Sequence, residues 1–361
     1  MILFYISGHG LGHMSRQGEV IKYLRKLNPS VKIAVKTPAA EFFVRENLHG
    51  EAIYQYLKID IGVEQSDSLD VEPLLTLQNY ARLLDRKAGI VESEAEWCKA
   101  NSVRLIVVDI PPFAFDIAQK AGIKSICITN FSWDWIYQPY VEMYPEYSSV
   151  IDDIKSSEAK CSLLLSTPFS GDLSAFPYRR DIPLIGRKSD LEVSDIRERL
   201  GISRGKKIIL FSFGGLGLKR VSELKPDLDE NTVVLTSRID TSAEGWIHFT
   251  DDDLKNRELS YRDLVHAADA VLTKPGYGIV SECIANNTGM LYLERKLFPE
   301  YEVFKREMSK YIPAVNIPLE DFYTGDWKRY FRQIIESKHN YERIDINGAG
   351  KAAEIILAGM E

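Results

Sequence analysis

The sequence predicts an α/β protein with two domains, each a parallel sheet wrapped by helices. Apolar runs of strand length alternate with amphipathic stretches of helix length, which is typical of parallel sheets. This alternation restarts near the middle of the chain. The length of 361 residues fits two domains of ordinary size, and the hydrophobic content of 45% is enough for two buried cores.

The first half contains five apolar runs that we expect to be strands. Amphipathic stretches between them are expected to be helices that cover the sheet. The expected strands lie near 2–7, 31–37, 103–109, 124–129 and 162–166, and the expected helices near 15–27, 38–48, 74–100 and 113–121.

The second half repeats this organisation after a polar stretch between residues 181 and 190. We therefore expect an N-terminal domain of residues 1–187 and a C-terminal domain of residues 188–361. The sequence does not decide whether the segment 341–361 crosses back onto the first domain. Strands are expected near 207–213, 232–237, 246–250, 269–273 and 289–293, and helices near 194–200, 260–267 and 278–286.

Composition narrows the class of protein. The net charge of −7 argues against a nucleic-acid-binding protein. No apolar run is long enough to span a bilayer, so we expect a soluble protein. The cysteines at 98, 127, 161 and 283 lack the CxxC spacing, and this scattering favours a reducing compartment, the cytoplasm.

A glycine-rich loop follows the first expected strand. It runs Gly8-His9-Gly10-Leu11-Gly12-His13 and leads into a helix. Glycines let backbone N–H groups approach a ligand, and a helix N-terminus favours an anion. A dinucleotide fingerprint would need a third glycine where His13 stands and an acidic residue at the end of the second strand, which instead closes with Lys36-Thr37. NAD binding is therefore not expected.

The most specific motif lies in the second half, where a strand leads into the loop from Lys274 to Glu282 and then into a helix. Lys274 supplies positive charge, and Gly276 and Gly278 allow close backbone approach to phosphates. Glu282 lies one turn into the helix and can accept hydrogen bonds from ribose hydroxyls. The motif predicts a nucleotide-diphosphate site, with an ordinary turn as the alternative.

These motifs together resemble glycosyltransferases of the two-Rossmann (GT-B) architecture over nearly the whole chain. Gly12-His13 resembles the Gly-His that follows the first strand in plant-type glucosyltransferases and in the lipid-linked N-acetylglucosaminyltransferase of peptidoglycan synthesis. The segment 276–282, with Ser281-Glu282, resembles their donor-binding loop, and 291–304 resembles their sugar-binding turn. The segment 129–137 is similar to the transferase-like N-terminal part of plant arabinokinases.

The resemblance implies a nucleotide-sugar donor, UDP-linked, in the second domain and a hydroxyl acceptor in the first. A lipid-linked acceptor would bring peripheral membrane contact. The resemblance also implies that Leu259 and Arg262, before the donor loop, face the base of the nucleotide. The sequence departs from the family pattern at Pro275 and Tyr277, which replace smaller residues of the donor loop. No glutamine marks the sugar-binding turn, which leaves Glu300 or Glu302 for the sugar.

His13 is the expected general base of an inverting transfer, since imidazole titrates near neutral pH and can take the proton of the acceptor hydroxyl. Asp109 ends a strand at the same sheet edge and is expected to orient it. A structural role near the helix N-terminus is the alternative for His13. His9, with Gly10 and Gly12, is expected on the acceptor side, although His9 could equally bind phosphate or turn outward.

No metal or other cofactor is expected, because N–H groups can stabilise the leaving diphosphate. These groups would come from the donor loop and from a second glycine turn that contains Gly214, Gly215 and Gly217. The segments 227–229 and 251–253 have the DxD spacing of metal-dependent transferases. Both lie in polar, turn-like sequence, and we interpret them as solvated.

An aromatic-rich segment follows the expected strand 124–129. Sugar rings stack on aromatic side chains, so we expect acceptor contacts from Trp133, with Ser132 and Asp134 as polar groups. The alternative is equally favoured, namely that these aromatic residues fill a core or a subunit contact.

Two other functions share this architecture. A nucleotide-sugar 2-epimerase would need carboxylates around the sugar and no acceptor site. A non-catalytic sugar-nucleotide sensor would keep Glu282 but would not need His13 beside Asp109. A kinase is not expected, because the segment 201–207 lacks the spacing and the hydroxyl residue of a P-loop and precedes a strand.

Overall fold

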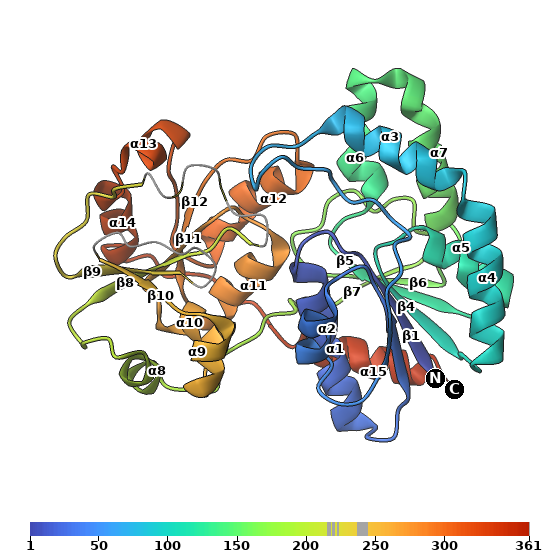
Figure 1. The fold of residues 1–361 in the computed structure, drawn as a ribbon, viewed down its shortest axis with the longest axis horizontal. Helices are drawn as coiled ribbons and strands as arrows, with labels where there is room; N and C mark the ends of the chain where they lie inside the picture. The colour runs from blue at the N-terminus through green and yellow to red at the C-terminus, as the bar shows by residue number, and fades with distance from the viewer. Residues whose placement is uncertain (215–217, 219–220, 222–223, 237–244, 361) are drawn as a thin grey trace.

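The computed structural model describes residues 1–360 except 215–217, 219–220, 222–223 and 237–244. Two sheets lie side by side, one in each half of the chain (Figure 1). The strands of both sheets pair in parallel. The predicted fold class is confirmed.

The first sheet has seven strands in the order β3-β2-β1-β4-β5-β6-β7. These strands are β1 (Ile2–Ile6), β2 (Ile33–Lys36), β3 (Ile53–Gln55), β4 (Leu105–Asp109), β5 (Ser125–Thr129), β6 (Leu163–Ser166) and β7 (Arg179–Asp181). The helices of this half are α1 (Gly12–Leu27), α2 (Glu41–Asn47), α3 (Pro73–Leu84), α4 (Lys87–Ala100), α5 (Phe113–Ala121), α6 (Trp133–Met143), the 3-10 helix η1 (Pro145–Tyr147) and α7 (Ser148–Glu158).

The second sheet has six strands in the order β10-β9-β8-β11-β12-β13. These strands are β8 (Lys207–Phe211), β9 (Thr232–Thr236), β10 (Trp246–His248), β11 (Ala270–Thr273), β12 (Gly289–Tyr292) and β13 (Ala314–Asn316). The helices described after β7 are α8 (Val193–Leu200), α9 (Asp251–Asn256), α10 (Tyr261–Ala267), α11 (Tyr277–Asn286), α12 (Pro299–Glu307), η3 (Met308–Lys310), α13 (Leu319–Thr324), α14 (Lys328–Ile335) and α15 (Gly348–Ala358).

Both faces of the inner strands of the first sheet are buried, because helices cover the sheet on two sides (Figure 1). Successive side chains of a strand point to opposite faces. Ile2, Phe4 and Ile6 of β1 therefore pack in one apolar cluster with α1, α2 and α15, whereas Leu3 and Tyr5 pack in another with α3 to α7. Burial on both faces explains why the strands appear in the sequence as continuous apolar runs.

The second sheet is built in the same way. Ile208 and Leu210 of β8 pack with α10 and α11, while Ile209 and Phe211 pack with α13 and α14. No helix among the described residues is long and apolar enough to cross a membrane.

Several elements differ from the sequence-based expectation. The stretch 74–100, expected as one helix, is two helices that break at Asp85 and Arg86. The first helix begins at Gly12, so that His13 lies in its first turn. The outer strands β3, β7 and β13 were not expected. They have three residues each and no fully buried run, so they lack the apolar signal of the inner strands.

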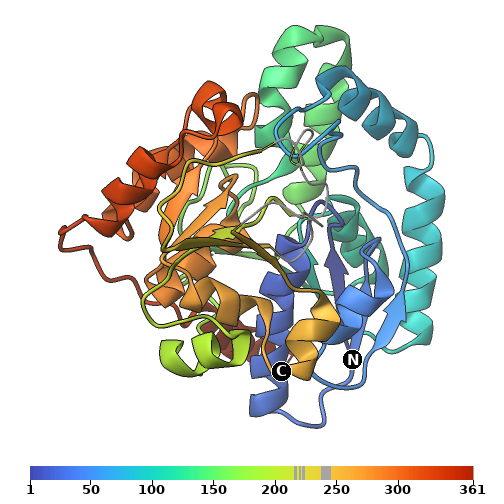
Figure 2. The same ribbon diagram turned by 60° about the vertical axis from the view of Figure 1, so that its left-hand side comes forward.

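The last helix crosses back to the first half. α15 follows the second sheet in the sequence but packs against α1, where Ala349, Ala352 and Ile356 are buried. Arg104 donates a hydrogen bond to the carbonyl of Met360 at 2.6 Å. Figures 1 and 2 both place the two chain ends at the same end of the first half.

Candidate active site

The carboxyl ends of β1 and β4 bring together two residues that are far apart in the sequence. These strands pair in parallel, with Ile6 opposite Asp109. Because the carboxyl ends of parallel strands share one sheet edge, the loop after β1 meets Asp109 there. Nδ1 of His13 lies 2.8 Å from Oδ1 of Asp109.

Asp109 is fully buried and holds several donors at once. Arg16 donates from Nη2 to Oδ1 at 2.6 Å and from Nε to Oδ2 at 2.9 Å, and Gln17 donates to Oδ2 at 2.7 Å. Burial alone would raise the pKa of Asp109. The charges of Arg16 and His13 and their hydrogen bonds outweigh burial and hold this pKa at about 2. Asp109 is therefore ionised at neutral pH.

The ionised carboxylate determines which nitrogen of His13 carries the proton. A carboxylate only accepts, so Nδ1 of His13 donates to Asp109. Nη2 of Arg16 lies 3.3 Å from the same Nδ1, but this contact is no hydrogen bond because a guanidinium has no acceptor. We infer that Nε2 of His13 keeps its lone pair and can take a proton.

Polar contacts link this sheet edge to the second half of the molecule. Arg16 donates from Nη1 to Asn130 at 2.9 Å, and Asn130 donates to Oε1 of Glu300 at 2.7 Å. The Arg16 guanidinium lies 4.7 Å from the centre of the Tyr277 ring. Burial raises the pKa of Glu300, which lies in the first turn of α12. Of the two glutamates considered for the sugar, Glu300 lies at this site, whereas Glu302 is exposed.

The glycine loops of the two halves approach each other closely. A Cβ atom on Gly278 would lie 3.3 Å from Cα of Gly12, and one on Gly12 would lie 3.7 Å from the backbone nitrogen of Gly278. A Cβ on Gly278 would therefore crowd Gly12, whereas one on Gly12 would make an ordinary van der Waals contact. The first turn of α1, which carries His13, therefore faces the N-terminus of α11.

Glu282 lies on α11 and is 4% exposed. Its Oε1 accepts hydrogen bonds from Arg187, from Nε at 2.6 Å and also from Nη2. Its Oε2 is buried without a hydrogen-bond partner in the described part of the chain. The Tyr261 hydroxyl, whose pKa is raised by burial and by the charge of Glu282, lies 2.6 Å from that of Ser212. A buried carboxylate oxygen without a partner fits a ligand hydroxyl.

Lys274 follows β11 and precedes Gly276, the N-cap of α11. Its ammonium group forms no hydrogen bond or ion pair within the described ranges, and its carbonyl accepts a hydrogen bond from Thr273 at 3.1 Å. Burial and the charge of Arg295 lower the pKa of Lys274 to about 7. An anion bound at the N-terminus of α11 would be stabilised by this ammonium group and by the free N–H groups of the first turn.

His9 lies between two aromatic rings. The ring of Trp133 lies edge-on at 5.4 Å between centroids, and the ring of Phe298 is stacked at 6.1 Å. Nδ1 of His9 accepts a hydrogen bond from the backbone N–H of Val63 at 3.2 Å. Burial and the charge of Arg295 lower the pKa of His9 well below its usual value. His9 is therefore neutral near pH 7, with its hydrogen on Nε2.

The residues expected to bind the acceptor through α6 are all buried, with 1% exposure for Ser132, 0% for Trp133 and 4% for Asp134. Ser132 donates to the Asp134 carboxylate, and the indole N–H of Trp133 donates to Oδ2 of Asp60 at 3.0 Å. These polar groups thus bond within the protein. Gly10, in the first glycine loop, is exposed.

The other donor-loop residues expected from the resemblance make internal contacts. Ser281 donates to the carbonyl of Gly278 at 2.9 Å. The Tyr277 hydroxyl accepts a hydrogen bond from the backbone N–H of Ile185 at 3.1 Å. Leu259 is buried in the apolar cluster shared by the two halves.

The second glycine turn is described only in part. Gly214 is exposed and has a φ of 72°, and Gly215 and Gly217 lie outside the described residues. The acidic segment 251–253 forms the first turn of α9, where Asp253 and Thr250 make a capping box. Within the described residues, no group of three or more histidines, cysteines, aspartates or glutamates could hold a metal ion.

Five further residues of the site were not predicted from the sequence. Arg16 and Gln17 lie three and four positions after His13 and hence on the same face of the helix. This spacing could have predicted that they lie beside His13. Asn130 directly follows β5, the neighbour of β4. The positions of Arg187 and Arg295 in the site depend on how the two halves pack together. No local sequence pattern predicts these positions.

Sequence comparison finds a curated relative that matches nearly the whole chain. No protein-family model matches the chain. L-arabinokinase of Arabidopsis thaliana is 29% identical over 361 residues, which cover 98% of this chain and 34% of that protein. The chain therefore spans about a third of the length of this curated relative.

Solved structures resemble the chain over both halves. The glycosyltransferase of kitacinnamycin is 14% identical, with a TM-score of 0.63 and coverage of 100% of this chain and 99% of that one. A UDP-glucosyltransferase from Polygonum tinctorium is 12% identical, with a TM-score of 0.58 and coverage of 99% and 98%. The chain has the fold of the GT-B glycosyltransferases, as the resemblance implied.

Proposed function

We propose that this protein is an inverting glycosyltransferase that moves a sugar from a UDP-linked donor to a hydroxyl acceptor. The observation that carries the proposal is the pairing of His13 with the ionised Asp109, opposite the donor loop at Gly278. The acceptor oxygen attacks the anomeric carbon while the bond from that carbon to the diphosphate breaks. The acceptor proton passes to Nε2 of His13, and Asp109 stabilises the resulting imidazolium.

The second half supplies the donor contacts in this proposal. The free Oε2 of Glu282 accepts from a ribose hydroxyl, and Lys274 with the N-terminus of α11 holds the diphosphate. As the glycosidic bond breaks, negative charge grows on the diphosphate, and these fixed groups stabilise it without a metal ion. Solved glycosyltransferases share the fold, and one of them is a UDP-glucosyltransferase, which supports a nucleotide-sugar donor.

We also propose a reducing, cytoplasmic location. Cys98, Cys127, Cys161 and Cys283 are all buried free thiols. Thiols of this kind persist where disulfides do not form. A lipid-linked acceptor would add peripheral membrane contact.

The test is release of UDP from a panel of UDP-sugars by the wild type and by His13→Ala. We expect slow release by the wild type in the absence of acceptor, and a loss of about 100-fold or more in the variant. UDP affinity, measured by calorimetry, should stay unchanged, because His13 acts on the acceptor. His339→Ala is the matched control, since His339 is exposed, and it should keep the wild-type rate. A wild-type rate in His13→Ala would contradict the assignment of the base.

The same incubation separates the two alternatives. An epimerised UDP-sugar would assign the epimerase, and binding without turnover would assign the sensor. The sensor has no use for a fixed imidazole tautomer, so the arrangement of His13 and Asp109 favours the transferase.

A further inference from the structure

Arg295 is a buried cation on which the charge of Glu300 acts, but no described residue forms a salt bridge or hydrogen bond with its guanidinium. It follows β12 and is 6% exposed, and its Nε and Nη2 atoms are buried without a hydrogen-bond acceptor. It forms no ion pair with any residue that the structure describes. Its guanidinium carbon lies 3.5 Å from the centre of the Phe298 ring. A charged group that has lost its water and gained no acceptor is costly, which indicates a missing anion.

The aromatic rings place Arg295 at the reacting end of the site. The Phe298 ring lies 6.3 Å from the ring of Phe131, and Phe131 lies 5.7 Å from the ring of His13. The same Phe298 ring stacks on His9. Glu282, the residue proposed to bind the ribose, is paired instead with Arg187.

Two cations from the second half therefore gather near the reaction centre, and they come from different loops. Lys274 precedes the N-terminus of α11, where the diphosphate is proposed to bind. Arg295 lies in the loop between β12 and α12, and Glu300, in the first turn of α12, accepts a hydrogen bond from Asn130 beside Arg16. The loop after β12 thus approaches the place that the transferred sugar would occupy, beyond the diphosphate.

We propose that Arg295 binds a carboxylate carried by the transferred sugar, so that the donor is a nucleoside-diphosphate uronic acid. This inference rests on the proposed function. A guanidinium presents paired N–H groups that match the two oxygens of a carboxylate, and the stacked Phe298 holds its plane in place. A neutral hexose would leave Nε and Nη2 of Arg295 without a charged acceptor, so the site should discriminate against it.

Calorimetric titration tests this with two matched pairs of ligands. One pair is UDP-glucose and UDP-glucuronate, the other is UDP-galactose and UDP-galacturonate, and UDP alone is the reference. In at least one pair, we expect the wild type to bind the uronate about tenfold or more tightly than the hexose. Arg295→Gln should abolish this preference and leave UDP affinity unchanged. Arg295→Lys keeps the charge without the paired geometry and should retain part of the preference. Arg306→Gln, on the exposed face of α12, should behave as the wild type.

Lys274→Met separates the two cations. It should weaken UDP and all four UDP-sugars by the same factor, because its proposed partner is the diphosphate. The inference is overturned if the wild type binds each uronate no better than its hexose. It is also overturned if Arg295→Gln weakens UDP and every UDP-sugar alike, which would assign Arg295 to the diphosphate. A wild type that binds no UDP at all would overturn the proposed function, and this inference with it.

Discussion

Arg16 and Asp109 form the electrostatic centre of the site. Arg16 is 4% exposed and Asp109 is 0% exposed, and two hydrogen bonds join them. Each compensates the charge of the other in a place that water does not reach. The pair therefore has two roles, since it holds the His13 ring in one tautomer and keeps the Arg16 guanidinium in position for Asn130.

The substitution Asp109→Asn separates these roles from simple packing, because the two side chains have nearly the same shape. We expect the free energy of unfolding to fall by about 3 kcal/mol or more, since Arg16 would keep a buried charge without its counter-charge. Urea denaturation measures this change. The control is Glu41→Gln, which breaks an exposed pair with Arg45 and should change stability little. Equal stability losses in both variants would contradict the argument.

At the residue scale, the sequence predicts best the contacts between residues that lie at or just after the ends of neighbouring strands. The contact of His13 with Asp109 could be predicted because His13 follows β1, Asp109 is the last residue of β4, and both strands end at one sheet edge. Arg295 could not be predicted in this way. Its burial depends on Phe298, which lies in the second half of the chain but packs in the apolar cluster of the first.

Among the elements, α7 is notable for the buried carboxylate at its C-terminal end. Glu158 ends this helix and is 0% exposed, and no described residue donates a hydrogen bond to its carboxylate oxygens. The Asp134 carboxylate is the group to which a protonated Glu158 can donate. Burial and the nearby charge of Asp134 raise the pKa of Glu158 well above its usual value. The helix C-terminus adds to this, because its dipole disfavours negative charge.

The sign of the pH dependence follows from this raised pKa. In the folded state Glu158 keeps its proton at pH values where the unfolded chain has released it. Stability that depends on this group is therefore present below the unfolded pKa and is lost as the pH rises above it. Glu158→Gln imitates the protonated form and should remove this loss.

We expect Glu158→Gln to be more stable than the wild type at pH 8 and nearly equal to it at the acidic end of the accessible range. Urea denaturation across this pH range measures the difference. Glu146→Gln, at an exposed position, is the control and should show no such trend. A stability difference that does not change with pH would contradict the role of Glu158.

Elements could be predicted where apolar runs are long. The inner strands of both sheets lie within a few residues of the expected ranges, because both their faces are buried. The break between α3 and α4 was missed, since residues 85 and 86 include neither glycine nor proline and the helical pattern continues across them. The edge strand β7 consists of three exposed charged residues. It therefore has neither an apolar run nor an alternating pattern that would predict a strand.

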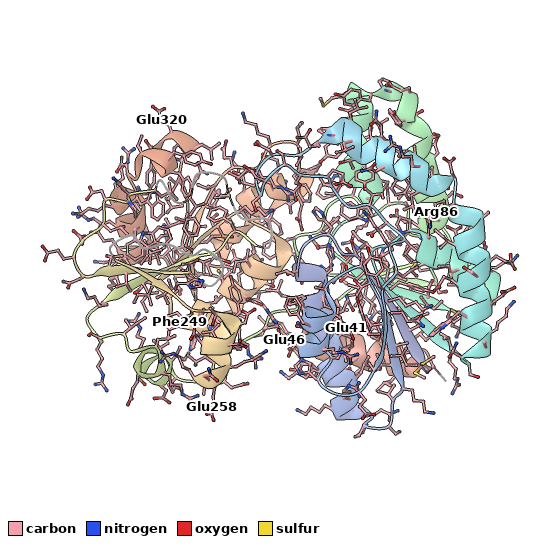
Figure 3. The ribbon with its side chains drawn as sticks, viewed as in Figure 1. Glu41, Glu46, Arg86, Phe249, Glu258 and Glu320 are labelled. Atoms are coloured by element: carbon pink, nitrogen blue, oxygen red, sulfur yellow. The ribbon has the colours of Figure 1, made fainter. Side chains whose placement is uncertain are left out.

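For the molecule as a whole, the site depends on how the two halves are held together. Besides the site contacts, Lys255 of α9 pairs with Glu46 of α2 at 2.7 Å, and Figure 3 shows Glu46 on the side of the first half that faces the second. Ser68 donates to the carbonyl of Phe213 at 2.7 Å. Helix α15 makes the most extensive of these contacts. It follows the second half in sequence and packs on α1, the helix that carries His13.

Because α15 packs mainly against α1, the helix that carries His13, its loss should affect turnover more than donor binding. Ala353 of α15 is fully buried, and Ala353→Asp would place a charge without a partner in this contact. We expect a loss of about 3 kcal/mol in the free energy of unfolding. We also expect UDP release to slow, since α1 and the donor loop would no longer be held in register. UDP affinity should change little, because Glu282 and Lys274 lie in the second half.

Glu354→Asp provides the control, since its side chain is exposed one position further along the same helix. It should match the wild type in urea denaturation, in the rate of UDP release and in UDP affinity. If Ala353→Asp lost UDP affinity as steeply as turnover, the second half would depend on α15 for its own folding. In that case α15 would be a core element of the donor-binding half, and the argument that it mainly positions one half against the other would fail.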